Sequence, residues 1–390
     1  MNNTCLKLLK TGLRFFFFLV SVACSQLGNS QHISDGMKFI NLPEAKDSNS
    51  FSISYSTLSY FRDYEYFKNN IQTGYTYFGT WHYPRLVIQP SKWLKLEAGA
   101  LLQRDFGDRG LQTAKALFSI QFMQKNLRII FGAIEGNLSH QLIEPVMGYD
   151  RIISRPVEEG FQVKYNTKRI MTDIWLDWEL RQTVNADYPE ELTGGLSFSY
   201  TVTKPGKPWQ VKIPVQMIMP HKGGQLDTNS AVVSTVLNSA AGLAAEWNNT
   251  DEKSFWKQFK LNGYYTGYTH FHKSNLYPFE KGSGLLANVF VKSKFDIAFL
   301  ATFWKGSKYI APLGAPICQS ISSISGKENY QEPDRSLLFL NLLYDKELFP
   351  NFYVDARITP YIDLKKGYLE HSFLIFLSYR NNFRIGPLKK

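Results

Sequence analysis

Apolar and polar residues alternate strictly along residues 169–181. The even positions include Ile174 and Trp178, whereas the odd positions include Asp173 and Asp177. A period of two sends these two sets to opposite faces of a β-strand. One face is compatible with hydrocarbon and the other carries charge, which is typical of a transmembrane strand that borders a wet lumen.

The same alternation recurs from residue 51 to the end of the chain and predicts about sixteen strands, with 14 to 18 compatible with the pattern. The segment 231–246 is rich in small residues and suits either a strand or a short helix in a loop or plug. The predicted strands cover residues 51–61, 71–89, 93–104, 112–123, 127–136, 158–165, 170–181, 192–203, 209–219, 238–248, 256–270, 284–291, 295–305, 335–345, 351–361 and 368–380.

The connections between these strands alternate in length. Short turns with Gly, Pro, Asn or Ser follow the even-numbered strands, and these residues favour turn dihedral angles. Longer loops follow most odd-numbered strands, at residues 137–157, 182–191, 220–237, 271–283 and 306–334. This sorting predicts an all-β, antiparallel, up-and-down transmembrane barrel with short periplasmic turns and long extracellular loops.

The mixed face of each strand carries charges of both signs, which predicts a hydrated lumen. A barrel of about sixteen strands encloses an aqueous channel if nothing plugs it. The predicted lumen-lining residues along the solute path are Lys95, Glu97, Lys115, Asp173, Asp177, Glu179, Arg181, Asp355 and Arg357.

The amino terminus has the features of a cleaved signal peptide. Three basic residues precede a nine-residue apolar run, which is too short to span a bilayer. Cleavage after Ala23 or after Ser30 fits the small residues there, and the second is preferred because Gln31 opens a polar leader. The expected organisation is a signal peptide at 1–30, a periplasmic leader at 31–50, the barrel at 51–380 and a basic tail at 381–390.

Composition narrows the possible chemistry. Removing residues 1–30 leaves 41 basic and 33 acidic residues, a net charge of +8, and Lys and Arg form no stripe that would bind nucleic acid. The mature chain keeps only Cys318, so neither a disulfide framework nor a cysteine metal site is expected. His270 and His272 share a face but lack a third ligand, and no cofactor or metal is predicted.

No catalytic motif of known spacing appears, so the sequence predicts no catalytic residues and no enzyme activity. Spacing along the chain nevertheless leaves open a hydrolase that assembles Ser, His and Asn from separate strands.

The signal peptide, the Trp175-Leu-Asp-Trp178 alternation and the sorted loops make the chain resemble the porin-like outer-membrane β-barrels of didermal bacteria. The resemblance implies residence in outer-membrane lipid, folding by the β-barrel assembly machinery, and a monomer or homotrimer. It also implies that the loop 137–157 can fold inward as a constriction. The candidate residues of that loop are His140, Glu144, Asp150, Arg151 and Arg155.

The resulting hypothesis is an outer-membrane channel for diffusion of small hydrophilic solutes. Two alternatives stay open: a non-conducting barrel that serves in binding, secretion or assembly, and an outer-membrane hydrolase. The non-conducting alternative is favoured if the segment 231–246 and the loop 306–334 fill the lumen.

Overall fold

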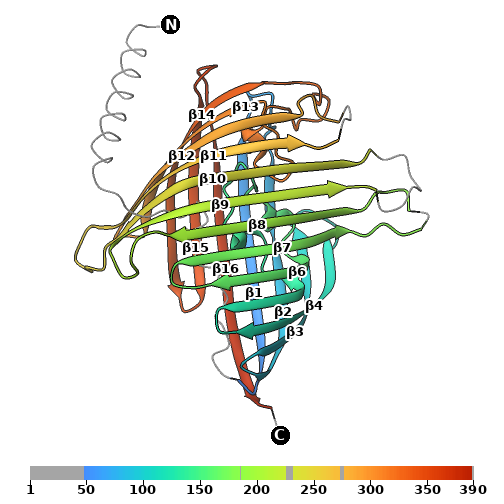
Figure 1. The fold of residues 1–390 in the computed structure, drawn as a ribbon, viewed down its shortest axis with the longest axis vertical. Helices are drawn as coiled ribbons and strands as arrows, with labels where there is room; N and C mark the ends of the chain where they lie inside the picture. The colour runs from blue at the N-terminus through green and yellow to red at the C-terminus, as the bar shows by residue number, and fades with distance from the viewer. Residues whose placement is uncertain (1–47, 185, 225–231, 273–275, 389–390) are drawn as a thin grey trace.

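The computed structural model describes residues 48–184, 186–224, 232–272 and 276–388. The predicted signal peptide and residues 31–47 of the predicted leader lie outside the described residues. Sixteen strands form one closed antiparallel barrel (Figure 1). They are β1 (Ser50–Glu65), β2 (Thr76–Ser91), β3 (Leu94–Asp105), β4 (Thr113–Gln124), β5 (Leu127–Ile134), β6 (Glu158–Asn166), β7 (Ile170–Leu180), β8 (Glu191–Thr201), β9 (Trp209–Lys222), β10 (Ser234–Asn248), β11 (Trp256–His270), β12 (Lys281–Ser293), β13 (Ile297–Ser307), β14 (Asp334–Phe349), β15 (Phe352–Asp363) and β16 (Leu369–Pro387).

Each strand pairs with its neighbours in sequence, and β1 closes the barrel against β16. The predicted fold and strand count are therefore confirmed. Short turns follow the even-numbered strands, and three of them place a non-glycine residue at positive φ: Lys125, Asp296 and Asn351. The longer connections follow odd-numbered strands, so the predicted sorting of the loops by length is also confirmed.

The structure decides the alternative left open for one segment and extends the predicted last strand. Most of the segment 231–246 forms β10, whose small inward side chains, such as Ala240, leave room for the loop after β13. Asn238 on β10 donates a hydrogen bond to the carbonyl of Ile310 in that loop, at 2.7 Å. The last strand continues to Pro387 instead of ending at residue 380, because Ser50 and the residues after it on β1 provide backbone partners for the predicted tail.

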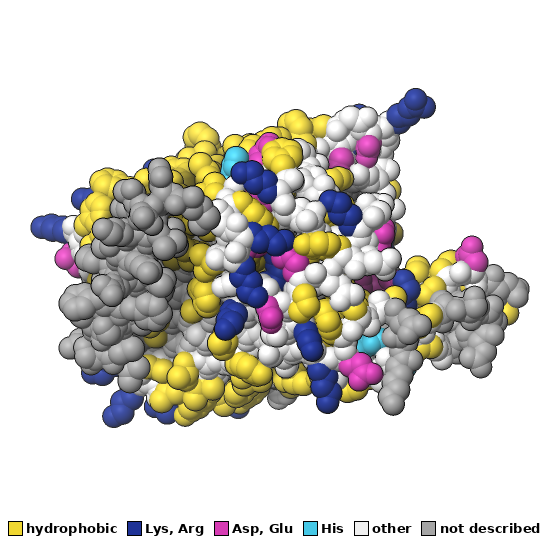
Figure 2. Space-filling model, turned by 90° about the horizontal axis from the view of Figure 1, so that it is seen from above, with side chains coloured by type: hydrophobic (Ala, Val, Ile, Leu, Met, Phe, Trp, Pro, Cys, Tyr) yellow, Lys and Arg dark blue, Asp and Glu magenta, His cyan; other side chains and the backbone are white. Residues whose placement is uncertain are grey.

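The outward face of the barrel is largely apolar. Exposed side chains on it include Phe118, Ile174, Phe299 and Ile358. In Figure 2, yellow hydrophobic side chains gather along the margins of the face presented, while Lys and Arg lie mostly across its centre. Aromatic pairs gather at the rim with the short turns, as in the interfacial girdle of a membrane barrel: Trp93–Phe122, Trp209–Trp247, Phe255–Trp256, Phe255–Phe295 and Phe349–Phe352.

Helices contribute little to the fold. Within the described residues, no helix is long and apolar enough to cross a membrane.

Two loops enter the lumen from the rim opposite the short turns. The loop 135–157 joins β5 to β6 and contains η3 (Asn137–His140) and α2 (Arg151–Ser154). The loop 308–333 joins β13 to β14 and contains η4 (Pro316–Cys318). Their apolar side chains form buried clusters with inward residues of the wall, including Trp175 and Trp304. The interior of the barrel is therefore a packed core that two loops cross.

Candidate functional site

The loop 135–157 is tied to the wall on several sides by hydrogen bonds to its backbone. Trp81 Nε1 on β2 donates to the carbonyl of Ile152 at 3.1 Å. On the far side, the amide of Ile143 donates to Gln216 Oε1 on β9 at 2.9 Å. Each bond satisfies a polar group that water cannot reach, so the wall side chains hold the loop in one path.

His140 is the most enclosed of the predicted loop residues, with no exposed surface. Its Nδ1 lies 3.0 Å from Asp173 Oδ2 and its Nε2 lies 3.0 Å from Glu158 Oε2. The imidazole stacks on the ring of Trp175 at a centroid distance of 3.5 Å. Burial lowers the pKa of His140, but the two carboxylates outweigh it and raise that pKa to about 9. His140 is therefore positively charged at neutral pH, and its ion pairs with Glu158 and Asp173 hold the loop against the barrel wall.

A second ionic contact fastens the end of the same loop. Arg155 makes a bidentate pair with Asp177, with Nε–Oδ2 at 2.9 Å and Nη2–Oδ1 at 2.8 Å. Arg151 lies 3.7 Å from Glu179 and 3.9 Å from Asp177. The structure thus brings together residues that the sequence analysis assigned to the lumen wall and to the constriction loop.

The other predicted lumen residues are dispersed. Lys95 contacts Glu97 at 2.5 Å. Both residues line a cavity of about 360 Å³, which is also lined by residues of the loop 135–157. Lys115 pairs with Glu159 near the surface. Arg181 is exposed and follows the end of β7, outside the strand.

The loop 308–333 closes the lumen against the first loop. Tyr309 donates its hydroxyl to the carbonyl of Pro145 at 3.1 Å, and the amide of Gly148 donates to the carbonyl of Leu313 at 2.7 Å. The amide of Ala315 donates to the carbonyl of Glu144 at 2.9 Å. Backbone groups of the two loops therefore satisfy each other across the barrel.

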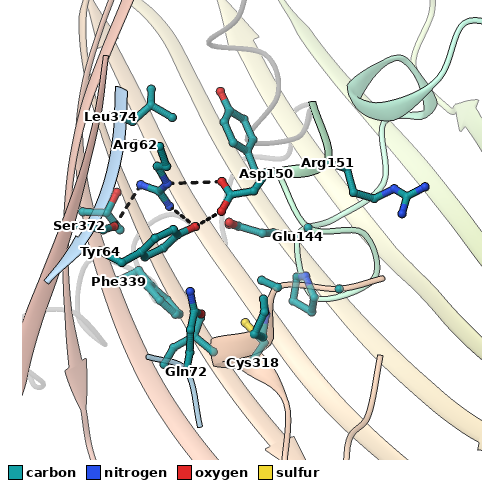
Figure 3. Close-up of a pocket in the computed structure, with 18 of the residues that line it drawn as sticks. Arg62, Tyr64, Gln72, Glu144, Asp150, Arg151, Cys318, Phe339, Ser372 and Leu374 are labelled. Atoms are coloured by element: carbon teal, nitrogen blue, oxygen red, sulfur yellow. Dashed lines mark hydrogen bonds and ion pairs between the residues drawn. The ribbon is translucent and has the colours of Figure 1, made fainter. Parts of the chain in front are cut away.

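Between the two loops and the wall lies a cavity of about 300 Å³ (Figure 3). Arg62 on β1 donates to Ser372 Oγ at 3.1 Å and to Tyr64 Oη at 2.8 Å. Tyr64 in turn donates to Asp150, and Arg62 Nε lies 3.4 Å from the same carboxylate. The predicted residues Glu144, Asp150, Arg151 and Arg357 all line this cavity.

A different polar group lies on the outer face of the barrel, where the neighbouring side chains are apolar. We call it the outer-face cluster: Tyr55, Thr57 and Ser59 on β1 with Thr80 and His82 on β2. His82 Nδ1 lies 2.7 Å from Tyr55 Oη and 3.1 Å from Thr57 Oγ1. His82 Nε2 lies 3.4 Å from Thr80 Oγ1, which lies 3.2 Å from Ser59 Oγ.

The cluster sits midway along β1, which runs from Ser50 to Glu65. Toward the long-loop rim it is bordered by three aromatic rings, with Phe61 contacting Phe78 at 5.3 Å and Phe373 at 5.5 Å between centroids. Polar side chains facing lipid are costly unless they bond to one another. The mutual hydrogen bonds of the cluster offset that cost and hold a histidine at the lipid boundary.

The hydrogen bonds determine which nitrogen of His82 can act as a base. Thr57 donates its hydroxyl proton to the carbonyl of Trp81 at 2.8 Å, so it can only accept from the imidazole. Nδ1 therefore carries the proton, and Nε2 lies 3.4 Å from Thr80 Oγ1, whose own proton is directed to the carbonyl of Leu58 at 3.2 Å. A hydroxyl beside a basic imidazole nitrogen is the arrangement of nucleophilic ester cleavage.

The sequence analysis did not select these five residues. One signal was available: in the run Ser54-Tyr-Ser-Thr-Leu-Ser59, polar residues occupy both faces of a predicted membrane strand, instead of only one. The partner His82 lies 23 residues beyond Ser59, and only the β1–β2 register, which pairs Thr57 with His82, brings them together.

Comparison with known families gives one match. The family model described as lipid A 3'-O-deacylase-type matches residues 43–388. The chain belongs to this lipid A 3'-O-deacylase-type family. A search of curated proteins finds no match. Membership in this deacylase-type family corrects the prediction of no enzyme activity, which was wrong because it rested on the absence of catalytic motifs of known spacing.

Solved structures similar to this deacylase-type barrel include an outer-membrane protein, OprD, and two Occ proteins. OprD of Pseudomonas aeruginosa has 11% identity and a TM-score of 0.48, and the match covers 89% of this chain and 97% of OprD. OccK2 of the same organism, in complex with glucuronate, has 9% identity and a TM-score of 0.48, covering 87% and 99%. OccAB3 of Acinetobacter baumannii has 9% identity and a TM-score of 0.47, covering 85% and 99%.

In its fold, the deacylase-type chain is the closed antiparallel barrel of sixteen strands that the sequence predicted. Among the described residues, no group of three or more His, Cys, Asp and Glu side chains is placed to hold a metal ion.

Proposed function

We propose that this barrel is an outer-membrane carboxylester hydrolase that removes an acyl chain from a lipid A-type glycolipid, with the outer-face cluster as its reaction centre. The observation that carries the proposal is the position of His82, within hydrogen-bonding reach of hydroxyl groups at the middle of a lipid-facing wall. Family membership supports the reaction class.

The cluster lies on the lipid-facing wall, beside the acyl chains of a membrane glycolipid. The ester groups of such a lipid lie near the boundary between hydrocarbon and headgroup, so the proposed reaction requires the glycolipid to sit deeper at β1 and β2, toward the middle of the wall. The ring of Phe61 and its two aromatic neighbours lies next to Ser59 and Thr80 along the strands, and these rings offer an apolar contact for an acyl chain.

The proposed reaction begins when the Thr80 hydroxyl turns its proton from the carbonyl of Leu58 to His82 Nε2, which takes this proton as Thr80 Oγ1 attacks the ester carbonyl carbon. The carbon–oxygen bond to the sugar then breaks, and His82 returns the proton to the leaving sugar oxygen. Water, activated by the same nitrogen, hydrolyses the acyl-enzyme and releases the fatty acid. Tyr55 and Thr57 keep the Nδ1 proton in place throughout, and thus act as positioning residues.

Ser59 is the alternative nucleophile, since its hydroxyl lies 3.2 Å from Thr80 Oγ1. In that variant Thr80 relays the proton from Ser59 to His82. Ser59→Ala distinguishes the two routes, because it abolishes the acyl-enzyme only if Ser59 is the nucleophile, whereas Thr80→Val removes either the nucleophile or the proton relay.

The experiment is deacylation of purified hexa-acylated lipid A in mixed micelles, followed by mass spectrometry. We expect loss of one acyl chain by the wild type and at least a ~100-fold lower rate for His82→Gln, because a general base contributes about that much or more. The matched control is His371→Gln, which removes an exposed histidine on the outer face of β16. Equal rates for wild type and His82→Gln would place the chemistry elsewhere.

The main hypothesis from the sequence was a channel for diffusion of small hydrophilic solutes through the lumen. The two loops that bond to each other across the barrel favour the non-conducting alternative over the channel. We therefore infer that the barrel does not conduct in its resting state, and a conductance measurement described in the Discussion tests this.

A further inference from the structure

The cavity of about 300 Å³ between the two lumen loops takes no part in the reaction proposed for the outer wall. It reaches the surface at the long-loop rim, because two of its lining residues are exposed there. These are Tyr75, which is 55% exposed and directly precedes β2, and Pro312 in the loop 308–333. The volume of the cavity is at the lower end of the range of small-ligand sites. A molecule the size of one sugar ring can therefore enter from this rim.

Glu144, in the loop 135–157, is the group in this cavity that calls for a partner. Among the described residues, its carboxyl group has no hydrogen bond and no ion pair, and both of its oxygens stay accessible. In Figure 3 the carboxyl group extends from the loop and no dashed line reaches it. Burial raises the pKa of Glu144, in spite of the opposing effect of Arg62 and Arg357. Hydrogen-bond donors on a ligand would offset the cost of holding this group without a partner.

Two further side chains present polar groups to the same space. They are Gln72, in the connection between β1 and β2, and Tyr77 on β2. Among the described residues, neither the Gln72 amide group nor the Tyr77 hydroxyl has a hydrogen-bond partner in the protein. The ring of Tyr77 packs edge to face on that of Tyr75, at 4.6 Å between centroids. The lining thus combines hydrogen-bonding groups with an aromatic surface, as is typical of a ligand pocket.

The charges around the cavity determine which class of ligand it suits. Arg62 donates to its neighbours through Nη1 and Nη2, and its Nε lies 3.4 Å from Asp150. Nε and Nη2 of Arg357 are buried. An anion in the cavity would therefore lie against the carboxylates of Glu144 and Asp150, and a cation would lie beside the two arginines. A neutral ligand avoids both repulsions.

We propose that the cavity binds a neutral sugar of one ring, with the carboxyl group of Glu144 accepting hydrogen bonds from two neighbouring hydroxyl groups of the sugar. A carboxyl group can accept at both oxygens, and hydrogen bonds to its ionised form are stronger than those between neutral groups. The rings of Tyr75 and Tyr77 offer a contact for the C–H groups of the sugar. The site is separate from the outer-face cluster, so sugar binding can be measured whether or not the barrel hydrolyses esters.

The experiment is calorimetric titration of the purified, full-length barrel in a detergent without a sugar headgroup. The probes are the neutral hexoses glucose, galactose and mannose, the cation glucosamine and the anion glucuronate. We expect saturable binding of at least one neutral hexose, and weaker binding of glucosamine and glucuronate. Saturable binding of none of the three neutral hexoses overturns the proposal, and so does tighter binding of either charged sugar.

The variant Glu144→Gln tests whether this residue holds the sugar. We expect affinity to fall ~10-fold to ~100-fold, since charge-assisted hydrogen bonds to the carboxylate are lost. Because the carboxyl group has no partner in the described part of the protein, the variant should be at least as stable as wild type in urea. The matched control is Glu252→Gln, at an exposed position in a short turn, which should keep the affinity of wild type. Sugar affinity that is unchanged in Glu144→Gln would also overturn the proposal.

Discussion

The ion pairs of His140 with Glu158 and Asp173 lead to a quantitative prediction about the stability of the barrel. The ordinary pKa of histidine is 6.5, and the two carboxylates raise that of His140 to about 9 in the folded barrel. This difference corresponds to ~3 kcal/mol of stabilisation by the charged form. Because the folded pKa is the higher one, the stabilisation is fully present below pH 6.5 and is lost as the pH rises through 9.

The perturbation is His140→Gln, which keeps a polar side chain but cannot carry charge between Asp173 and Glu158. We expect wild type to exceed the variant by about 3 kcal/mol in free energy of unfolding at pH 6, and by much less at pH 10. At high pH both proteins leave the two carboxylates beside a neutral group, which is why the difference should shrink.

The assay is urea unfolding of the detergent-folded barrel, with the free energy of unfolding extrapolated to zero denaturant at several pH values. The informative quantity is the difference between wild type and variant, since lysines and tyrosines titrate equally in both. A difference that stays constant from pH 6 to pH 10 would refute the reasoning, because His140 would then not be the group that titrates.

Three further predictions concern the lumen and the wall. In planar bilayers the wild type should give no stable conductance steps. Asp177→Asn replaces the carboxylate in the bidentate pair with Arg155 by a neutral amide, and should increase transient openings. Stable ohmic steps in the wild type would contradict a closed lumen. Gly132→Ala should destabilise the barrel by about 1–3 kcal/mol in urea, because φ is +99° and a Cβ would meet the carbonyl oxygen of Phe118 at 2.3 Å. Its control Gly263→Ala, where a Cβ meets nothing within 4 Å, should be nearly neutral. Burial raises the pKa of the Cys318 thiol, so iodoacetamide should modify it only after unfolding; mass spectrometry that finds rapid labelling of the folded barrel would show that the loop 308–333 opens.

The strand pattern was readable from the sequence because a membrane wall imposes one rule along its whole length. Side chains on the outer face must suit lipid, and those on the inner face need not. The outward position of Ile174 and the inward position of Asp173 can therefore be predicted from the strand alone. The same applies to Ile358 and Arg357 on β15. The alternating loop lengths indicate which end of each strand lies at which rim. The order of strands in the closed barrel could therefore be predicted from local information.

Local information also located the loop 135–157, but not what it does. The residues predicted there, among them His140 and Arg155, are held by carboxylates on β6 and β7. Alternation marks Asp173 and Asp177 as inward, yet an inward carboxylate can line a pore or fix a loop. Which of these occurs depends on a partner far along the chain.

The sequence alone determined the strands, their lipid and lumen faces and the order of the barrel, because each follows from the period of a short segment and the length of the next turn. Only the tertiary structure decided that two loops fill the lumen, that Arg357 borders a cavity, and that His82 meets three hydroxyl-bearing residues on the outer wall. These facts depend on register between strands and on loops that cross the barrel. Contacts of that kind satisfy buried or lipid-facing polar groups, and such groups find their partners through space and not through spacing in the sequence.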